Sequence, residues 1–355
     1  MLISDIRIEG FRSYKDSSFS FKDGANIIWG ENARGKTNLL EAVMLLSGAQ
    51  SWRSRRRGDI INFYEQQARI TGRAEARSRV FEIKIGLPLK GRASYTVNGV
   101  SQKRQFDLSD YFRCVLFCPE DLFLVKGGPE KRRRFIDQAL CQLRPRYAAI
   151  LGEYGKLMEL KQYVLKEGGT AAVLPEINER MIYYSAELIH YRAAFLSELS
   201  REAGELHRSI SRGMERLELK YKTVSSVTDP EADTATLRRQ LSEHMESHAE
   251  AEEQSRSLLS GAHKDDIEIM INGSAARAFA SQGQARTAAL SLKFGERELF
   301  RIDSGEYPVL LLDDVLSELD AGRRAFVASA AVGGQTLITC CNPPEVFEDA
   351  NVIEV

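Results

Sequence analysis

The stretch Gly30-Glu31-Asn32-Ala33-Arg34-Gly35-Lys36-Thr37 decides the fold. It fits the pattern G-x4-G-K-[ST] and directly follows the apolar segment 25–29, which we predict to be a strand. Residues 36–48 carry an apolar face that predicts a helix. A strand, a glycine-rich turn and a helix in this order form the context in which the pattern binds phosphate. The sequence therefore predicts an α/β fold built around a phosphate-binding loop.

This loop predicts a site for ATP and Mg²⁺. Glycines let its backbone N–H groups surround phosphate oxygens at the positive end of the helix dipole. We expect Lys36 to reach the β- and γ-phosphates and the Thr37 hydroxyl to bind Mg²⁺. The predicted nucleotide-binding residues of the loop are Gly30, Glu31, Asn32, Ala33, Arg34, Gly35, Lys36 and Thr37.

A second apolar segment, 309–312, ends in two carboxylates, Asp313 and Asp314. We expect Asp313 to complete the Mg²⁺ shell from the end of a strand, and Asp314 to orient the attacking water. The predicted catalytic residues are thus Lys36, Asp313 and Asp314, and the predicted metal ligands are Thr37 and Asp313. The alternative is a buried strand capped by solvated acids.

The turn Ser281-Gln282-Gly283-Gln284 precedes a predicted helix. A Ser/Gly turn at a helix N-terminus is a second place where an anion binds. An ordinary helix cap explains the same residues equally well. The position of the turn ahead of the Asp313 strand favours the anion site.

Charge is distributed unevenly along the chain. The formal net charge is −1, but the first 150 residues hold 27 Lys and Arg against 16 Asp and Glu. This surplus predicts an anionic partner, nucleic acid first among them. The chain shows no secretory signal, no apolar stretch of membrane-spanning length and no paired cysteine spacing, so we expect a cytoplasmic protein without a membrane partner.

Two basic clusters are the candidate DNA contacts. Their residues are Arg53, Arg55, Arg56 and Arg57, and then Lys131, Arg132 and Arg133. Lys and Arg bind phosphates without regard to sequence, because neutralising the backbone releases counterions. The alternative is that these side chains are solvated charges or structural ion pairs.

Strand-like segments fill both ends of the chain, and the middle is helical. Predicted strands cover 2–9, 17–21, 25–29, 67–73, 80–87, 93–97, 113–117, 217–224, 267–271, 308–312 and 335–340. Asn98-Gly99 and Asn272-Gly273 are hairpin signals, which predict antiparallel pairing. Beyond Pro129, apolar residues recur at steps of three and four, with Pro145 expected to kink or break the first helix.

This pattern predicts three segments along the chain. Residues 1–128 and 259–355 are expected to build one ATP-binding lobe, and residues 129–258 an inserted helical lobe. Sustained heptad-like spacing from Ile177 to Ile210 favours a long helix there. Whether the helices form a projecting arm or a compact bundle stays open.

These residues resemble the ABC-type ATPases of the SMC group and, within it, the RecF family of bacterial DNA replication and repair proteins. The matching segments are Phe11–Tyr14, 30–42, Pro119–Leu122, Leu124–Gly127, Arg132–Asp137, Gly261–Asp266, Ser281–Thr287 and Leu311–Asp320. They span nearly the whole chain in the order found in the family.

The resemblance implies an ABC-type P-loop ATPase lobe with an antiparallel β subdomain, plus an inserted lobe of long, coiled-coil-like helices. Ser281 and Gly283, with Gln284 beside them, would contact the γ-phosphate of ATP bound to another subunit. ATP binding would then drive head-to-tail homodimerisation, and slow hydrolysis would reset it. Ser317–Asp320 would lie at the dimer interface, and Arg12 near the nucleotide.

The resemblance also implies a biological role. It indicates a weak, DNA-stimulated ATPase at the nucleoid that binds double-stranded DNA and junctions of single and double strands without sequence specificity. Its partners would be RecR, with RecO. Together they would repair gaps and replication forks by directing recombinase loading and SOS induction.

Three segments depart from the family pattern: Gln50-Ser-Trp-Arg53, Gly261-Ala-His-Lys264 and Thr339-Cys-Cys-Asn342. The γ-phosphate sensor and the Q-loop residue stay unassigned. Three rival readings of the P-loop remain. A P-loop kinase would turn over ATP as a monomer, a transporter ATPase subunit would carry a histidine after the last core strand, and a DNA-binding module would have a vestigial ATP site. The complete loop and the paired acids disfavour the last of these.

Overall fold

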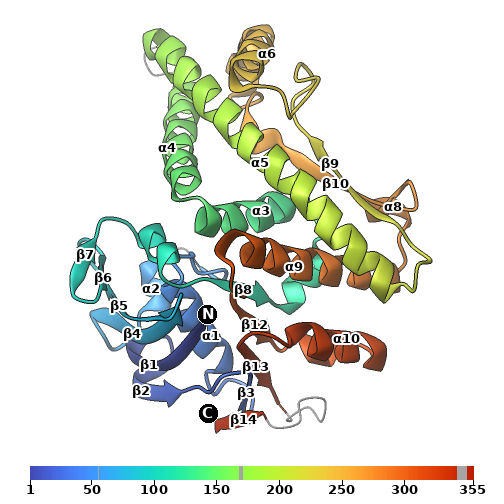
Figure 1. Ribbon diagram of the computed structural model, residues 1–355. Helices are drawn as coiled ribbons and strands as arrows, with labels where there is room; N and C mark the ends of the chain where they lie inside the picture. Colours follow the sequence, from blue (N-terminus) through green and yellow to red (C-terminus); the bar gives the residue numbers. More distant parts are fainter. Residues whose placement is uncertain (55, 168–170, 342–349) are drawn as a thin grey trace. The chain divides into compact units, whose positions relative to one another are not determined.

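The computed structural model describes residues 1–54, 56–167, 171–341 and 350–355. These residues form two compact units (Figure 1). Unit 1 takes in residues 1–123, 205–214 and 282–355, and unit 2 takes in 124–204 and 215–281. The domain division predicted from the sequence, at residues 128 and 258, stays a prediction.

Unit 1 contains a six-stranded antiparallel sheet in the order β2-β1-β4-β5-β6-β7. The strands are β1 (Leu2–Phe11), β2 (Tyr14–Ser20), β4 (Gln67–Ala76), β5 (Arg79–Pro88), β6 (Ser94–Val97) and β7 (Val100–Gln102). Along β4, buried residues alternate with more exposed ones, so one face of the sheet covers the core. Asn98 and Gly99 have φ of 49° and 79°, which confirms the predicted hairpin turn.

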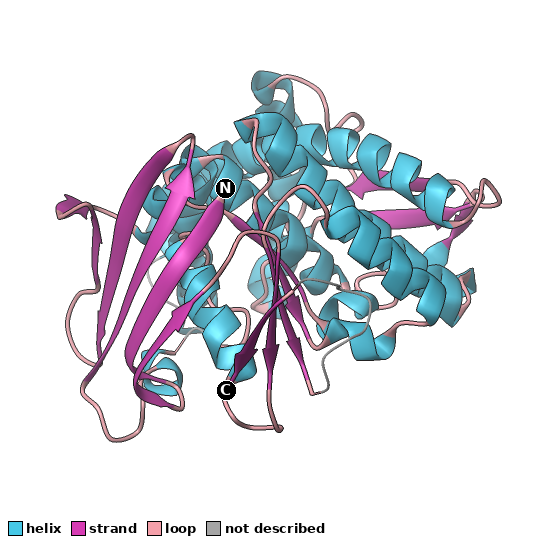
Figure 2. Cartoon of the chain, turned by 60° about the horizontal axis from the view of Figure 1, so that its bottom comes forward, coloured by secondary structure: helices cyan, strands magenta, loops and turns pink. Residues whose placement is uncertain are grey.

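A five-stranded parallel sheet in the order β14-β3-β13-β12-β8 forms the second layer of unit 1. Its strands are β3 (Ala25–Trp29), β8 (Cys114–Phe117), β12 (Val309–Asp313), β13 (Thr336–Cys340) and β14 (Asn351–Glu354). Every residue of β8, β12 and β13 is buried, as expected for parallel strands covered on both faces. Because the strands are parallel, their carboxyl ends meet at one edge. Figure 2 shows the two sheets of unit 1 as separate layers of strands.

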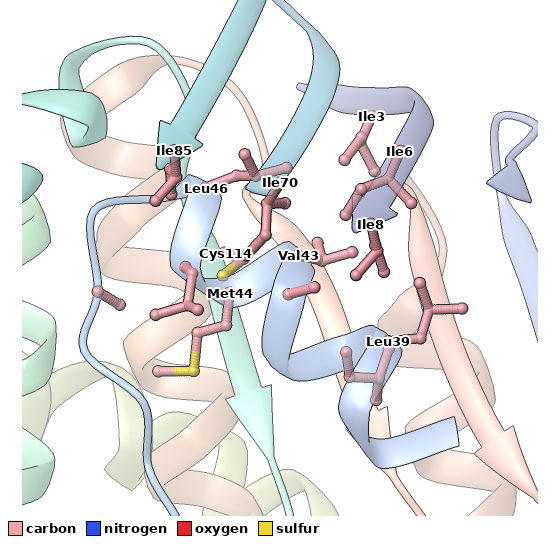
Figure 3. Close-up of a cluster of buried hydrophobic side chains, with 14 of the residues drawn as sticks. Ile3, Ile6, Ile8, Leu39, Val43, Met44, Leu46, Ile70, Ile85 and Cys114 are labelled. Atoms are coloured by element: carbon pink, nitrogen blue, oxygen red, sulfur yellow. The ribbon is translucent and has the colours of Figure 1, made fainter. Parts of the chain in front are cut away.

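Helix α1 (Lys36–Leu46) packs between the two sheets. Its side chains Leu39, Val43, Met44 and Leu46 lie among Ile3, Ile6 and Ile8 of β1, Ile70 of β4, Ile85 of β5 and Cys114 of β8 (Figure 3). All are at most 3% exposed. Burying each large aliphatic side chain stabilises the fold by roughly 1.5–3 kcal/mol. This packing fixes the first turn of α1 at the carboxyl edge of the parallel sheet.

The remaining helical segments of unit 1 surround this core. They are α2 (Arg57–Ile60), η1 (Gln105–Asp110), η2 (Pro119–Phe123), α9 (Gln282–Ser304), η5 (Val315–Glu318) and α10 (Ala321–Ala331). Helix α9 packs against β8 and η2 through a largely buried apolar face.

Long helices dominate unit 2, as the heptad-like spacing predicted. Helix α3 (Pro129–Leu143) ends where α4 (Pro145–Glu167) begins, because Pro145 disfavours a helical backbone at Arg144, which is extended. Helix α5 (Leu174–Ile210) follows, with its last six residues counted in unit 1. Its stripe of Met181, Leu188 and Leu199 is fully buried.

A small antiparallel sheet completes unit 2, in the order β11-β10-β9. The remaining elements of the unit are η3 (Ala171–Val173), β9 (Leu217–Lys222), α6 (Thr234–Ser247), α7 (Ala249–Ser255), η4 (Ala262–Lys264), β10 (Asp266–Ile271), β11 (Ser274–Ala275) and α8 (Ala276–Phe279). The buried guanidinium of Arg192 pairs with Asp137 at 2.9 Å and with Asp265 at 2.8 Å. These ion pairs hold the start of the sheet against the helices.

Candidate nucleotide-binding site

The predicted phosphate-binding loop connects the end of β3 to the start of α1. Gly30, Ala33 and Gly35 have φ of 155°, 69° and 112°, so the loop needs left-handed backbone at three places. A Cβ on Gly35 would lie 2.9 Å from both the Ser13 Oγ and the Tyr14 hydroxyl, and Tyr14 donates to the Gly35 carbonyl at 3.1 Å. Glycine is therefore required at position 35 by conformation and by space.

Lys36 lies at the centre of this loop and is only 8% exposed. Its Nζ donates to the carbonyl oxygens of Gly30 at 2.6 Å and Glu31 at 2.9 Å. The cation is thus held inside the curve of the loop, at the N-terminus of α1, where the helix dipole also favours negative charge. Such a cradle suits a phosphate group.

Thr37 and Asp313 meet beside the loop. The Thr37 hydroxyl donates to Asp313 Oδ1 at 2.9 Å, which joins α1 to the end of β12. Burial raises the pKa of the Asp313 carboxyl, while the hydroxyls of Thr37 and Thr339 oppose that shift. A hydroxyl and a carboxylate side by side are oxygen donors of the kind Mg²⁺ prefers. The residues present therefore fit both ATP and its metal ion.

Thr339 is a residue of this site that sequence reasoning missed. In the parallel register it stands beside Asp313, and its hydroxyl donates to Asp313 Oδ1 at 2.9 Å. The same hydroxyl accepts the Asp314 N–H at 2.9 Å. A threonine near the end of the neighbouring core strand is the signal that points to it. Thr339 therefore positions both acids.

Asp314 differs from its neighbour in exposure and conformation. Its φ is 51°, and its side chain is exposed where β12 ends. Burial raises the pKa of its carboxyl, and the Lys36 cation lowers it. The acid thus lies in the electrostatic field of the loop lysine without being enclosed by it.

The predicted second anion turn lies at the start of α9. Gly283 and Gln284 belong to unit 1, whereas Ser281 is the last residue of unit 2. Arg323 of α10 donates to the Gly283 carbonyl at 2.8 Å and to the Thr287 hydroxyl at 2.8 Å. The Asp320 carboxylate caps α10 and also pairs with the Arg323 guanidinium. The start of α9 is therefore tied to the segment predicted to lie at a dimer interface.

Arg12, predicted to lie near the nucleotide, forms a bidentate ion pair with the buried Glu41 of α1. The two nitrogen–oxygen distances are 2.9 and 2.6 Å. Glu41 also accepts hydrogen bonds from the Ser51 hydroxyl at 2.5 Å and from Arg53 at 3.4 Å. Sequence reasoning missed Glu41, because a glutamate in a helix usually faces solvent. It anchors two segments, the turn at Arg12 and the stretch from Ser51 to Arg53, to the helix of the loop.

The first basic cluster is only partly exposed. Arg53 donates to Asn38 Oδ1 at 2.6 Å and remains exposed, as does Arg56. Arg57 is half-buried and donates to the Gly91 carbonyl at 2.6 Å. Arg55 lies outside the described residues. Arg53 and Arg56 are thus the described members with exposed side chains.

Two arginines of the second basic cluster make contacts within unit 2. Arg132 is 3% exposed, and its guanidinium pairs with Asp266 at 2.7 and 2.9 Å. It also donates to the Gly127 carbonyl at 2.7 Å, so its charge is neutralised by contacts within unit 2. Arg133 is half-buried and donates to the Asp265 carbonyl at 2.5 Å, whereas Lys131 is exposed. Arg132 thus forms the structural ion pair that the sequence left open as the alternative, and its contact with DNA phosphate stays a prediction.

Across residues 1–54, 56–167, 171–341 and 350–355, no cluster of three or more His, Cys, Asp or Glu side chains is arranged to hold a metal ion. Within the same residues, none of the helices has the length and apolar character needed to cross a bilayer.

Comparison with known proteins places this site in a family. The family model described as "RecF/RecN/SMC N terminal domain" matches residues 2–354. The DNA replication and repair protein RecF of Geobacillus thermodenitrificans is 38% identical over 335 residues, which cover 93% of this chain and 90% of the relative. The RecF protein of Bacillus cereus strain G9842 is 36% identical over 365 residues, covering 100% and 97%.

Solved structures agree with the sequence comparison. A structure described as the recombination mediator protein RecF-ATPrS in the RecFOR pathway has a TM-score of 0.92 and 31% identity, covering 100% of this chain and 96% of that one. An Smc head bound to the C-terminal winged-helix domain of ScpA has a TM-score of 0.54 at 17% identity, which shows a shared fold alone. The predicted fold class, an ABC-type ATPase lobe with a further helical lobe, is confirmed. The chain therefore belongs to the RecF family of DNA replication and repair proteins.

Proposed function

We propose that this protein is an ATP-dependent DNA-binding clamp whose grip is set by nucleotide-driven pairing of two subunits. The observation that carries the proposal is the contact between the Thr37 hydroxyl and Asp313 beside the Lys36 cradle. It assembles the cation, the metal-binding oxygens and the loop of an ATP site within one subunit. The solved RecF relatives are described as complexes with ATP and with ATPrS, which supports ATP as the ligand.

The residues of the cradle have distinct roles in this proposal. Lys36 binds the β- and γ-phosphates, and Thr37 with Asp313 holds Mg²⁺, which supplies charge neutralisation at the phosphates. Asp314 orients water for a slow hydrolysis that DNA stimulates. Thr339 keeps both acids in place through its hydroxyl.

Closure of the site needs a second copy of the chain. Ser281, Gly283 and Gln284 of one subunit face the γ-phosphate held by the other, and Ser317–Asp320 lines the interface between them. The bonds of Arg323 to Gly283 and Asp320 support this role, because they connect the start of α9 to the interface segment. ATP binding then favours the paired state, and hydrolysis weakens it.

The proposed substrate is DNA, as duplex and as junctions of single and double strands, without sequence specificity. The exposed Arg53, Arg56 and Lys131 are the described cluster residues best placed to reach phosphates. The proposed partners are RecR, with RecO, since the solved relative is described as part of the RecFOR pathway. On this proposal the protein acts in the cytoplasm at the nucleoid, where it directs recombinase loading at gaps and replication forks and SOS induction.

Sedimentation at micromolar protein concentration tests the clamp. ATP with Mg²⁺ should convert the wild-type chain from monomer to dimer, and DNA should strengthen the conversion. The variant Ser281→Arg should bind ATP as tightly as wild type, because the loop of its own subunit is intact. It should remain monomeric, because the added side chain blocks the partner's phosphate.

Two results would count against the proposal. Equal masses of the wild type with and without ATP, at low salt, would remove nucleotide-driven pairing. DNA affinity that does not change with salt concentration would remove the basic surface, since phosphate contacts release counterions.

A further inference from the structure

Two adjacent aromatic side chains of unit 1 are exposed to an unusual degree. Phe63 is 96% exposed and Tyr64 is 85% exposed, on the turn between α2 and β4. Large apolar side chains are normally buried, because burial removes their surface from water. Paired aromatic rings left in solvent therefore indicate a surface that another molecule covers.

The turn that carries the two rings is firmly held. Asn62 donates through its backbone to the Gly10 carbonyl at 2.9 Å and through its side chain to the Arg12 carbonyl at 2.7 Å. Its Oδ1 also accepts the Tyr64 N–H at 3.1 Å, and its own side chain is buried. The backbone beneath the rings is thus fixed before any partner arrives, which lowers the entropy cost of binding.

Positive charges surround the rings. The Lys15 ammonium lies 5.9 Å from the centre of the Tyr64 ring. The neighbouring turn 88–92 is joined to this one by the Leu89 N–H, which donates to the Gln66 carbonyl at 2.8 Å, and it exposes Lys90 and Arg92. The acidic residues of the same segments are Glu65, Asp59 and Asp16, all exposed, and Asp16 is paired with Arg7 at 2.9 Å. The three cations therefore outnumber the two remaining acids, so the surface favours an anionic partner.

Aromatic rings combined with cations match single-stranded nucleic acid. Unpaired bases stack on aromatic side chains whatever their sequence, while cations follow the phosphates. Duplex DNA offers the cations the same phosphates, but its bases are stacked inside and cannot reach the rings. We propose that Phe63 and Tyr64 form a stacking platform for the bases of single-stranded DNA, with Lys15, Lys90 and Arg92 contacting its phosphates.

This platform rests on the proposed DNA-binding function. It adds to that function the surface that binds unpaired strands. Fluorescence anisotropy with the full chain, ATP and Mg²⁺ tests it, using a labelled oligothymidylate and a labelled blunt duplex as separate probes. The variant Phe63→Ala/Tyr64→Ala should lose about ten-fold or more in affinity for the single strand, as expected for lost stacking. Its affinity for the duplex should stay within about two-fold of the wild type, because phosphate contacts supply it.

The chain offers a matched control. Phe279 of α8, in unit 2, is 77% exposed, so Phe279→Ala removes a comparable solvent-exposed ring. It should leave both affinities unchanged. The variant Phe63→Trp/Tyr64→Trp should retain single-strand affinity, and its fluorescence should be quenched when the oligothymidylate binds. Unchanged circular dichroism will show that each variant is folded.

The outcomes separate this proposal from the clamp. If the wild type binds neither probe, the DNA-binding function itself fails. If the wild type binds both probes and Phe63→Ala/Tyr64→Ala binds the single strand equally well, the platform alone is overturned. Loss of ATP-driven pairing with unchanged single-strand affinity would also overturn it and would assign the rings to a second copy of the chain.

Discussion

Replacing Thr339 by valine should weaken the fold of unit 1 and its hold on the metal together. The Thr339 hydroxyl donates to Asp313 Oδ1 and accepts the Asp314 N–H, each at 2.9 Å, and the residue is 1% exposed. Valine keeps the shape of the side chain but leaves a buried carboxylate one donor short. Hydrogen bonds to charged groups contribute about 1.5–3 kcal/mol, so we expect the free energy of unfolding to fall by that amount.

The same loss should raise the pKa of Asp313 beyond the increase that burial already causes. Metal binding needs the ionised carboxylate, because Asp313 is proposed to ligate Mg²⁺. As the pH falls, the variant should therefore lose half of its Mg²⁺-dependent ATP binding at a higher pH than the wild type does. Calorimetric titration of the variant and the wild type across a pH series measures this midpoint.

Thr336 on the same strand provides the control. It is also 1% exposed, but among the described residues no group is placed to hydrogen-bond its hydroxyl. Thr336→Val should therefore stabilise unit 1 by about 1 kcal/mol, because it removes a hydroxyl that is buried away from water without a hydrogen bond in return. Urea unfolding followed by tryptophan fluorescence reports on unit 1, since both tryptophans, Trp29 and Trp52, belong to it. Equal effects of the two substitutions on stability would refute the reasoning.

Three further substitutions test other parts of the structure. Lys36→Met should abolish measurable ATP binding in an equilibrium titration while leaving circular dichroism unchanged, because the loop would lose its central cation. Arg132→Met should lower the free energy of unfolding by about 3 kcal/mol, because Asp266 would lose its ion-pair partner. The control Lys131→Met, at the exposed neighbouring position, should lower it by less than about 0.5 kcal/mol. Burial lowers the pKa of His263 in the folded chain to about 4. As the pH drops from about 6.5 towards 4, the unfolded chain therefore binds a proton at this residue before the folded chain does. The free energy of unfolding should fall over that range. His263→Gln should flatten that fall in denaturation curves recorded by circular dichroism.

The local parts of the site were predictable from the sequence because each is one contiguous pattern. The loop from Gly30 to Thr37 specifies its own strand, turn and helix, and the apolar run before Asp313 specifies a buried strand. Pro145 marked the end of α3 because its ring excludes a helical residue before it. In these cases the physical cause lies within a few residues of its effect.

The parts that were missed depend on partners distant in the chain. In the sequence, Arg132 is one of several basic residues on a predicted helix, yet its charge is neutralised by Asp266 in a later strand. From the sequence, Glu41 is expected to face solvent, yet Arg12 pairs with it from the turn after β1. Thr339 gains its role only from the parallel register with Asp313. Contacts of this kind produce no periodic pattern in either segment, so the sequence does not predict them.

The order of strands in the parallel sheet has a consequence for synthesis of the chain. Strand β3, which leads into the loop, pairs with β13 on one side and β14 on the other, and both are translated long after it. At roughly 5–20 residues per second, the nascent β3 waits on the order of tens of seconds after leaving the ribosome before either partner emerges. During that interval its apolar residues are open to chaperones and to aggregation. Substitutions that slow translation or weaken β13 should therefore reduce the yield of folded protein more than its final stability.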